Sequence, residues 1–204
     1  MTTAPNRRYL VSKRIFDVVV CLLALVVILP ILAVCALAIR LDSPGPAFFT
    51  QERTGRDARR FRMLKFRTML ANAEELKAAL AHLNVLPPPD FKIPNDPRIT
   101  RVGRFLRATS LDELPQLLNV LRGDMSLVGP RPTSFPASKY DLWHTHRLDV
   151  APGMTGLWQL EGRNAMTFDE RLRLDVKYIR NMSLTFDLKL ILRTVVVVVK
   201  RSGA

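Results

Sequence analysis

The feature of this chain that most constrains its fold is a run of 22 residues without a charge, residues 18–39, near the N-terminus. A helix of that length can cross the hydrocarbon core of a bilayer, which is about 30 Å thick. Basic residues flank the run on both sides: Arg7, Arg8, Lys13 and Arg14 precede it, and Arg40, Arg53, Arg56, Arg59 and Arg60 follow it. Because basic flanks stay on the cytoplasmic side of a membrane, we expect both ends of the run on one side.

A proline inside the run suggests how both ends reach the same side. Pro30 divides the run into 12 and nine residues, and proline removes a helix hydrogen bond and clashes with the preceding turn. Each half is about 13 to 18 Å long as a helix, too short to cross a bilayer but long enough to enter one leaflet. We therefore favour a re-entrant helix–break–helix within residues 1–41, broken at Pro30. A spanning helix kinked at Pro30 is the alternative, because membrane helices tolerate proline.

The composition limits the classes of partner. The net charge is +13 and 48% of the residues are apolar, whereas a disordered basic tail would be poor in apolar residues. We expect a folded protein whose partner is nucleic acid, an anionic phospholipid membrane or a phosphorylated substrate. Cys21 and Cys35 form no disulfide framework and no zinc-site spacing. The three histidines, His82, His144 and His146, are interpreted as ordinary surface residues.

The remainder of the chain, residues 42–204, alternates short strands, turns and amphipathic helices. Strands are predicted over residues 47–51 and 61–67 and should form a hairpin. Helices are predicted over residues 70–83, 114–121, 167–180 and 187–200, although residues 194–199 also suit a strand. The predicted fold class is α+β and mainly helical. A re-entrant membrane segment (residues 1–41) precedes one compact cytoplasmic-face domain (residues 42–204) with interfacial amphipathic helices and a small β-hairpin.

Two adjacent carboxylates, Asp112 and Glu113, open the helix predicted over residues 114–121. Ser110-x-x-Glu113 is a capping-box pattern, and acids in a first turn interact well with the helix dipole. The pair also suits chemistry, because nearby arginines and helix N–H groups would lower the pKa of a carboxylate and keep it ionised as a nucleophile toward phosphorus. Its neighbour could hold Mg²⁺ through oxygen ligands. Taken alone, the pattern favours the cap, and both explanations can hold together.

One arginine lies in a rigid turn. Arg131 stands between two prolines in residues 129–132, and their rings restrict the backbone around it. Its guanidinium suits bidentate phosphate recognition. A solvated arginine in a rigid surface turn is an equal alternative.

Four further charged residues have both a functional and an ordinary reading. Lys65 and Arg67 share one face of a predicted strand, where they could bind phosphate or lipid headgroups or simply face solvent. Arg163 follows a glycine in a loop, where functional groups are common but ordinary arginines are commoner. Asp175 is either a solvated charge or the partner of an arginine.

Segments from about residue 13 to residue 203 together resemble the bacterial monotopic phosphoglycosyl transferases, also called bacterial sugar transferases. In chain order these are KRIFD (13–17), QxRxG (51–55), KFRTM (65–69), SLDELPQ (110–116), GDMSLVGPRP (123–132), PGxTG (152–156), GR (162–163) and LD (174–175). The long central block is highly specific. The chain resembles the small form, which has the catalytic domain and little else. Two positions depart from the family pattern, Leu29 where members often have serine and Ala151 where many have arginine.

The resemblance implies a reaction and a location. Members transfer a sugar-1-phosphate from a UDP-sugar to a polyprenyl phosphate such as undecaprenyl phosphate and release UMP, at the cytoplasmic face of the bacterial inner membrane. By analogy, Asp112 attacks the β-phosphate to form an aspartyl phosphosugar, and Glu113 beside it helps to hold Mg²⁺. The other matching motif positions, expected near the substrates, are Lys65, Arg107, Arg131, Arg163 and Asp175.

Two other function classes compete with this reading. A nucleic-acid-binding protein would explain the charge, but among the basic residues only Phe61 and Phe66 offer stacking surfaces, so we expect no nucleic acid. In a non-catalytic membrane adaptor, the carboxylates would be caps alone. The sequence does not identify the sugar or the glycan pathway, and it leaves a homo-oligomer open.

Overall fold

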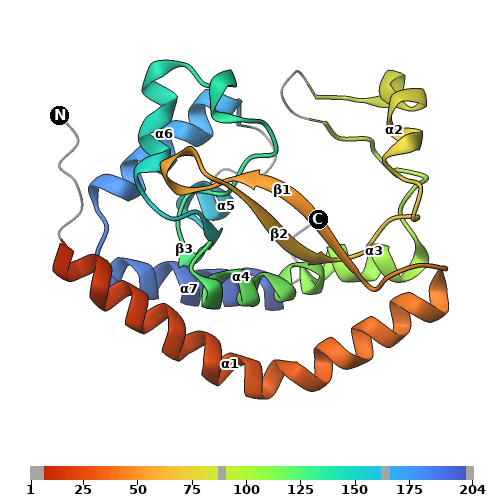
Figure 1. The fold of residues 1–204 in the computed structure, drawn as a ribbon, viewed down its shortest axis with the longest axis horizontal. Coiled ribbons are helices and arrows are strands. Elements are labelled where there is room, and N and C mark those ends of the chain that lie inside the picture. The colour runs from red at the N-terminus through yellow and green to blue at the C-terminus, as the bar shows by residue number, and fades with distance from the viewer. Residues whose placement is uncertain (1–6, 87–90, 162–165, 201–204) are drawn as a thin grey trace.

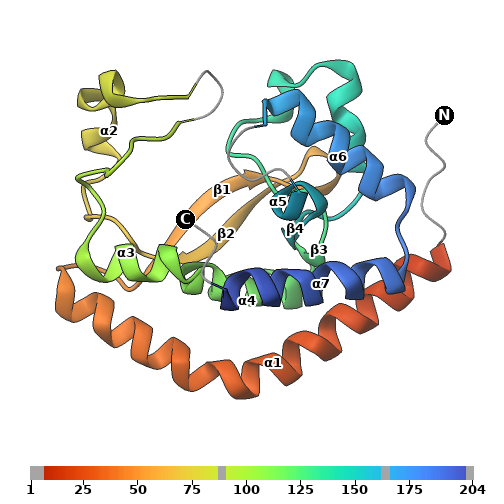
Figure 2. The same cartoon turned by 180° about the vertical axis from the view of Figure 1, so that it is seen from behind.

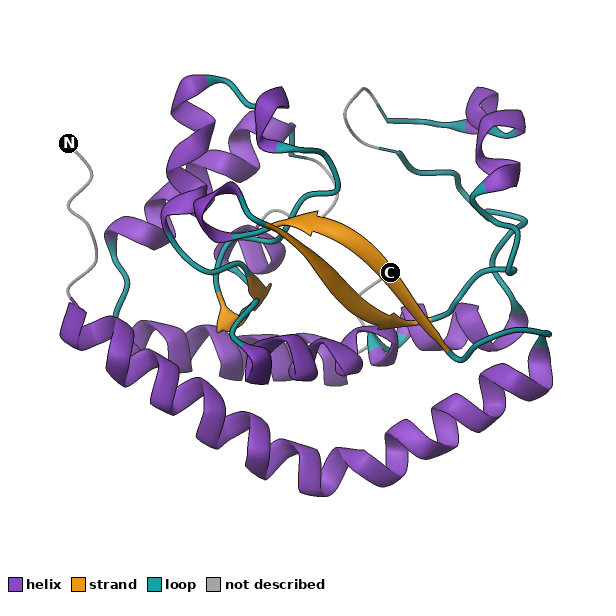
Figure 3. Ribbon diagram, viewed as in Figure 1, coloured by secondary structure: helices purple, strands orange, loops and turns teal. Residues whose placement is uncertain are grey.

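A computed structural model describes residues 7–86, 91–161 and 166–200 of the chain (Figure 1). Most of it is helical, as predicted, and Figure 3 separates the helices from two small sheets. The helices are α1 (Arg7–Asp42), α2 (Glu75–Ala79), α3 (Arg101–Ala108), α4 (Leu117–Arg122), α5 (Leu157–Glu161), α6 (Phe168–Arg180) and α7 (Leu184–Val199). The strands are β1 (Phe48–Thr54), β2 (Arg60–Phe66), β3 (Ser126–Val128) and β4 (Gly153–Thr155).

The apolar run forms one bent helix. α1 contains Pro30, and Figure 1 shows the helix as an arch whose two ends approach the rest of the protein while its middle bows away. Cys21 and Ile39, toward the two ends, are buried, whereas Val26 near the middle is 78% exposed. The predicted interruption at Pro30 is therefore wrong: the helix bends and continues, because a proline disturbs only the turn before it. By length and composition α1 could also cross a membrane.

A buried polar cluster attaches the first half of α1 to the domain. Asp187 of α7 is completely buried and accepts hydrogen bonds from Tyr9 (2.8 Å), Lys13 (2.8 Å) and Tyr178 (2.7 Å). Burying a charge is costly unless it is paired and hydrogen-bonded, so these three donors explain how an aspartate lies inside the protein. Helices α1, α6 and α7 therefore meet at one carboxylate.

Two further contacts of α1 reach β3 and α4. Asp17 accepts a 2.7 Å hydrogen bond from the hydroxyl of Ser126. Arg14 donates to the carbonyl oxygens of Val120 and Leu121 at the end of α4, where helix carbonyls lack partners. Figures 1 and 2 both show α3, α4 and α7 as a layer between the arch and the hairpin.

The other end of α1 is capped by Arg67, just after β2. Its guanidinium donates to the carbonyl oxygens of Pro44 and Ser43, and the residue is only 6% exposed. The alternative that Arg67 simply faces solvent is therefore wrong, although Arg67 does line the same cavity as Lys65. It holds the chain where α1 turns into the hairpin.

The predicted hairpin is confirmed. β1 and β2 pair antiparallel, from Phe48 opposite Phe66 to Thr54 opposite Arg60. β3 and β4 form a short parallel pair that was not expected, because residues 152–156 read as a turn. A side-chain carbon at Gly153 would lie 2.0 Å from the backbone nitrogen of Gly129, so the close approach of the two segments requires glycine.

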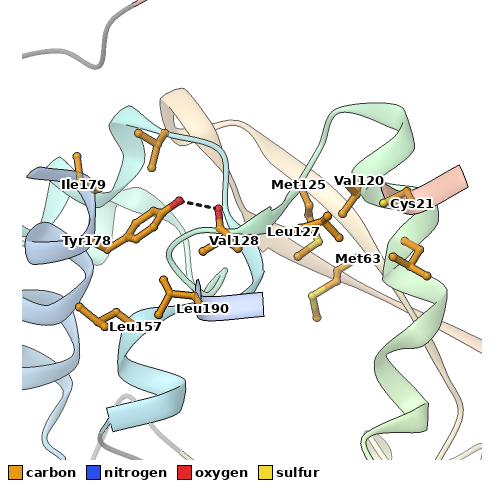
Figure 4. Packing of buried hydrophobic residues seen from close by; sticks show 12 residues of the cluster. Cys21, Met63, Val120, Met125, Leu127, Val128, Leu157, Tyr178, Ile179 and Leu190 are labelled. Carbon is orange, nitrogen blue, oxygen red and sulfur yellow. Dashed lines mark hydrogen bonds between the residues drawn. The ribbon is translucent and has the colours of Figure 1, made fainter. Parts of the chain in front are cut away.

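The main core lies between these elements. Figure 4 shows Tyr178 and Ile179 of α6 facing Leu190 of α7 and Val128 of β3, while Met63 of β2 packs on the far side. Tyr178 donates its hydroxyl to the carbonyl of Val128 at 3.1 Å. This cluster fixes β3, and with it the turn that follows β3.

Several local predictions were confirmed and others were wrong. The capping box at Thr167 starts α6, and α7 is a helix rather than a strand. The helix predicted over residues 70–83 shrinks to α2 and a short 3₁₀ turn. His144 is only 6% exposed and packs edge-on against Phe168, so it is not a surface residue.

Candidate active site

A cavity of about 760 Å³ collects the predicted site residues from four separate segments. Asp112 and Glu113 come from a 3₁₀ helix, η3 (Leu111–Gln116), between α3 and α4. Lys65 comes from β2, Arg107 from α3 and Arg131 from the turn after β3. Arg67 lines the cavity as well, so the fold brings together six of the eight charged residues that the sequence singled out.

The capping box predicted at Ser110 is wrong, although both carboxylates do lie in the first turn of η3. Ser110 has a φ of 57°, in the left-handed region, and its side chain makes no cap hydrogen bond among the described residues. The Glu113 amide instead donates to the backbone oxygen of Ser110 at 3.2 Å. Strain of this kind in a non-glycine residue clusters at functional sites. The Glu113 carboxylate consequently points away from the backbone it was expected to cap.

Glu113 is held by two cations. Lys65 lies 2.9 Å from its Oε1, and Arg131 binds both carboxylate oxygens. Burial raises the pKa of Glu113, but the charges of Arg131 and Lys65 outweigh burial and hold this pKa well below its usual range. Glu113 therefore remains ionised and fixes the position of both cations.

Asp112 is left without such a partner. It is half-buried, and within the described residues it makes no hydrogen bond or ion pair. Burial raises its pKa, while Lys65, Arg107 and Arg131 act from nearby in the opposite direction. The predicted lowering of a carboxylate pKa thus falls on Glu113 and not on Asp112. An unpaired, partly desolvated carboxylate among cations is a stronger nucleophile than a solvated one.

Arg107 also acts on Asp112 from the cavity lining. Its Nε donates to the hydroxyl of Thr68 at 2.9 Å, and its pKa is lowered mainly by burial. The cavity lining also includes the apolar residues Phe48 and Phe49 of β1 and Val198 of α7. One cavity thus offers cations for phosphates and apolar side chains for a lipid substrate.

Asp175 lies outside this cavity, in a second one of about 180 Å³. It is 2% exposed and its Oδ2 lies 2.9 Å from Nη2 of Arg147, so it is the partner of an arginine and not a solvated charge. Burial raises its pKa to about 7. The cavity shares Arg53 and Arg131 with the larger one. Arg163, also predicted for the site, lies outside the described residues.

The fit of a magnesium ion depends on oxygen donors. No group of three acidic, His or Cys side chains gathers within the described residues. A carboxylate accepts about four hydrogen bonds, and Glu113 uses three of them on Lys65 and Arg131. The remaining position of Glu113 and the carboxylate of Asp112 suit Mg²⁺, which often takes one or two carboxylates and completes its shell with phosphates and water.

Comparison with known proteins identifies the family. The model of the bacterial sugar transferases matches residues 8–201. The chain belongs to this family. It is 46% identical over 96% of its length to the galactosyl transferase CpsE of Streptococcus agalactiae, of which it covers 44%. It is 45% identical over 94% of its length to the undecaprenyl-phosphate galactose phosphotransferase of Salmonella typhimurium, of which it covers 41%.

A third bacterial sugar transferase resembles the chain over more of its own length. The UDP-glucose:undecaprenyl-phosphate glucose-1-phosphate transferase of Caulobacter vibrioides is 44% identical over 90% of this chain, which covers 68% of the relative. The chain spans less than half the length of the first two relatives. These relatives share the domain described above and are named for both galactose and glucose.

Sequence reasoning missed three residues of this bacterial sugar transferase site. Arg53 and Trp158 line both cavities, and Arg147 connects Asp175 to the turn that carries Arg131. Arg53 stood in a recognised segment (51–55) without an assigned role, and Trp158 lies just after another (152–156). No local pattern marks Arg147, because its partners lie 16 and 28 residues away in the sequence.

Proposed function

We propose that the chain transfers a sugar-1-phosphate from a UDP-sugar to a polyprenyl phosphate. The observation that carries this proposal is the unpaired, half-buried carboxylate of Asp112 among Lys65, Arg107 and Arg131. Three cations around one carboxylate suit a reaction between anions, because they offset the repulsion between the nucleophile and a diphosphate. The names of the relatives support the same pair of substrates.

The first step forms a covalent intermediate. A carboxylate oxygen of Asp112 attacks the β-phosphorus, and the bond to the oxygen that bridges the two phosphates breaks. The electron pair leaves with UMP, and the sugar phosphate remains on Asp112. Arg131 and Lys65, positioned by Glu113, are placed to bind the phosphoryl oxygens as charge moves to the leaving group.

The second step uses the lipid. An oxygen of the polyprenyl phosphate attacks the same phosphorus and displaces the Asp112 carboxylate, which returns to its starting form. The apolar side chains of Phe48, Phe49 and Val198 in the cavity lining suit the first prenyl units. Mg²⁺ held by Asp112 and Glu113 would neutralise phosphate charge.

We further propose that the arch dips into the cytoplasmic leaflet of a bacterial inner membrane and returns. The basic flanks and the exposed apolar middle of α1 support this placement. Single cysteines in place of Arg7 and Asp57, both exposed, should react with an impermeant reagent from the cytoplasmic side alone. The native Cys21 and Cys35 are buried and give little background. Labelling from opposite sides would establish a spanning helix.

The reaction is tested by replacing the nucleophile. Asp112→Asn should abolish UMP release from UDP-galactose and UDP-glucose in nanodiscs that contain undecaprenyl phosphate. Asp57→Asn is the matched control, because Asp57 is exposed and its φ of 53° suits asparagine. Turnover by Asp112→Asn would exclude the covalent mechanism. Mass spectrometry of the wild type with a UDP-sugar but no lipid should find the added sugar phosphate on Asp112.

A further inference from the structure

The backbone of the turn that carries Arg131 is held from outside the turn. Pro130 and Pro132 have no N–H group, so the turn contributes few donors of its own. The carbonyl oxygen of Pro130 accepts a 2.9 Å hydrogen bond from the amide of Gly153. The carbonyl oxygen of Arg131 itself accepts from Nη2 of Arg147. Arg147 therefore contacts the main chain of the residue whose side chain binds Glu113.

Arg147 is buried and has one acidic partner within the described residues. It is 6% exposed, and its Nη2 lies 2.9 Å from Oδ2 of Asp175. Its Nη1 lies 3.4 Å from the hydroxyl of Tyr140, and its guanidinium lies 6.0 Å from the centre of that ring. An unpaired guanidinium would be costly to bury, so Asp175 allows Arg147 to lie beneath the turn.

We propose that Arg147, neutralised by Asp175, is a positioning residue for Arg131. Its guanidinium fixes the main chain of Arg131 and thereby the direction of the side chain that binds Glu113 and the substrate diphosphate. Nη2 of Arg147 lies against both the Arg131 carbonyl oxygen and Oδ2 of Asp175, while Nη1 faces the Tyr140 hydroxyl. A lysine is a point charge on a flexible stem and has no second nitrogen to hold that orientation. The binding of a diphosphate in this proposal rests on the proposed function. The chain of contacts that leads from Asp175 through Arg147 and Arg131 to Glu113 does not.

A double-mutant cycle tests whether Arg147 acts through Arg131. Arg147→Met should lower kcat for UMP release about 10- to 100-fold, the size of effect that a misplacement of about 1 Å produces. In an Arg131→Lys background the same change should cost less than about 3-fold, because interacting residues are not additive. Equal losses in both backgrounds would show that Arg147 has a general structural role, and the proposal would be overturned.

Conservative variants keep the test informative if Arg147→Met does not fold. Arg147→Lys retains the charge beside Asp175 but loses the second nitrogen that faces Tyr140 and orients the guanidinium, so it should retain the melting temperature better than the activity. Asp175→Asn should lower kcat in the same way. Arg180→Met, exposed on α6, is the control and should change neither. Full activity of Arg147→Lys would overturn the proposal.

A readout without substrate separates this inference from the proposed function. In ¹⁵N-arginine NMR spectra of the full chain, the Arg131 guanidinium hydrogens bound to Glu113 should exchange slowly with solvent, and faster in Arg147→Lys. If the wild type releases no UMP from any UDP-sugar, the proposed function is wrong. The NMR exchange measurement still tests whether Arg147 positions Arg131. Unchanged exchange in Arg147→Lys would overturn that role even if UMP release is confirmed.

Discussion

Replacing Asp187 by asparagine should strongly destabilise the attachment of α1 to the domain. Asp187 is completely buried and accepts hydrogen bonds from Tyr9, Lys13 and Tyr178. Asparagine removes the charge and turns one acceptor into a donor, so at least one of the three donors loses its partner. The ammonium of Lys13, itself 6% exposed, would retain only Asp17, at 4.0 Å.

The expected cost follows from this burial. Removing one member of a buried ion pair costs about 3–5 kcal/mol, because the other charge stays buried without a partner. A chain of 204 residues loses about 2–4 °C of melting temperature per kcal/mol. The melting temperature of Asp187→Asn should therefore fall by about 6–20 °C. Circular dichroism of the protein in nanodiscs measures this shift.

A surface pair provides the matched control. Glu52 lies 3.7 Å from Arg60 and its side chain is 67% exposed, so Glu52→Gln should change the free energy of unfolding by at most about 1 kcal/mol. Replacing both partners, with Lys13→Met and Asp187→Leu together, should recover part of the loss, because Lys13 no longer stays buried without Asp187. Asp17 then keeps its hydrogen bond from Ser126 but loses its charged neighbour. If Asp187→Asn costs no more than Glu52→Gln, the cluster does not hold α1 and the reasoning is refuted.

Three further predictions follow from single residues. UMP release should fall as the pH drops through about 7, the raised pKa of Asp175, because protonation removes the charge that pairs with Arg147. Asp175→Asn should lack this fall. If the variant still shows it, Asp175 is not the group that titrates. Val26 is 78% exposed in the arch, and Val26→Asp should release the protein from vesicles. Val85 lies outside the arch and is 59% exposed, so Val85→Asp should not release it. If both variants stay bound to vesicles equally well, the arch does not insert. Asn119 is completely buried and binds two backbone groups of β2. Asn119→Ala should therefore lower the free energy of unfolding in urea by about 2–6 kcal/mol. A smaller loss than that of Glu52→Gln would show that water replaces the Asn119 side chain.

The features predicted correctly depend on residues close together in the sequence. The uncharged run requires a long apolar helix whatever surrounds it. Thr167 and Glu170 cap α6 because the groups they bind lie within one turn. The alternating residues of the hairpin likewise find their partners across a short connection.

The wrong predictions depend on contacts across long stretches of chain. Ser110 was predicted to cap a helix, but packing places it in a left-handed conformation. Glu113 binds Lys65, 48 residues away, and Arg131, 18 residues away, so its electrostatics could not be inferred from its neighbours. Strand alternation placed Arg67 on one face with Lys65, but its guanidinium binds the Ser43 carbonyl and caps the end of α1.

By itself, the sequence determined which segments are apolar, where α6 begins and which residue types are available for chemistry. Those properties follow from side-chain type and short-range spacing. The tertiary structure alone decided that Glu113 binds the cations, that Asp112 has no hydrogen bond or ion pair within the described residues, and that α1 bends without breaking. A carboxylate's pKa and partners are set by burial and by the charges packed around it, and these appear only when distant segments meet.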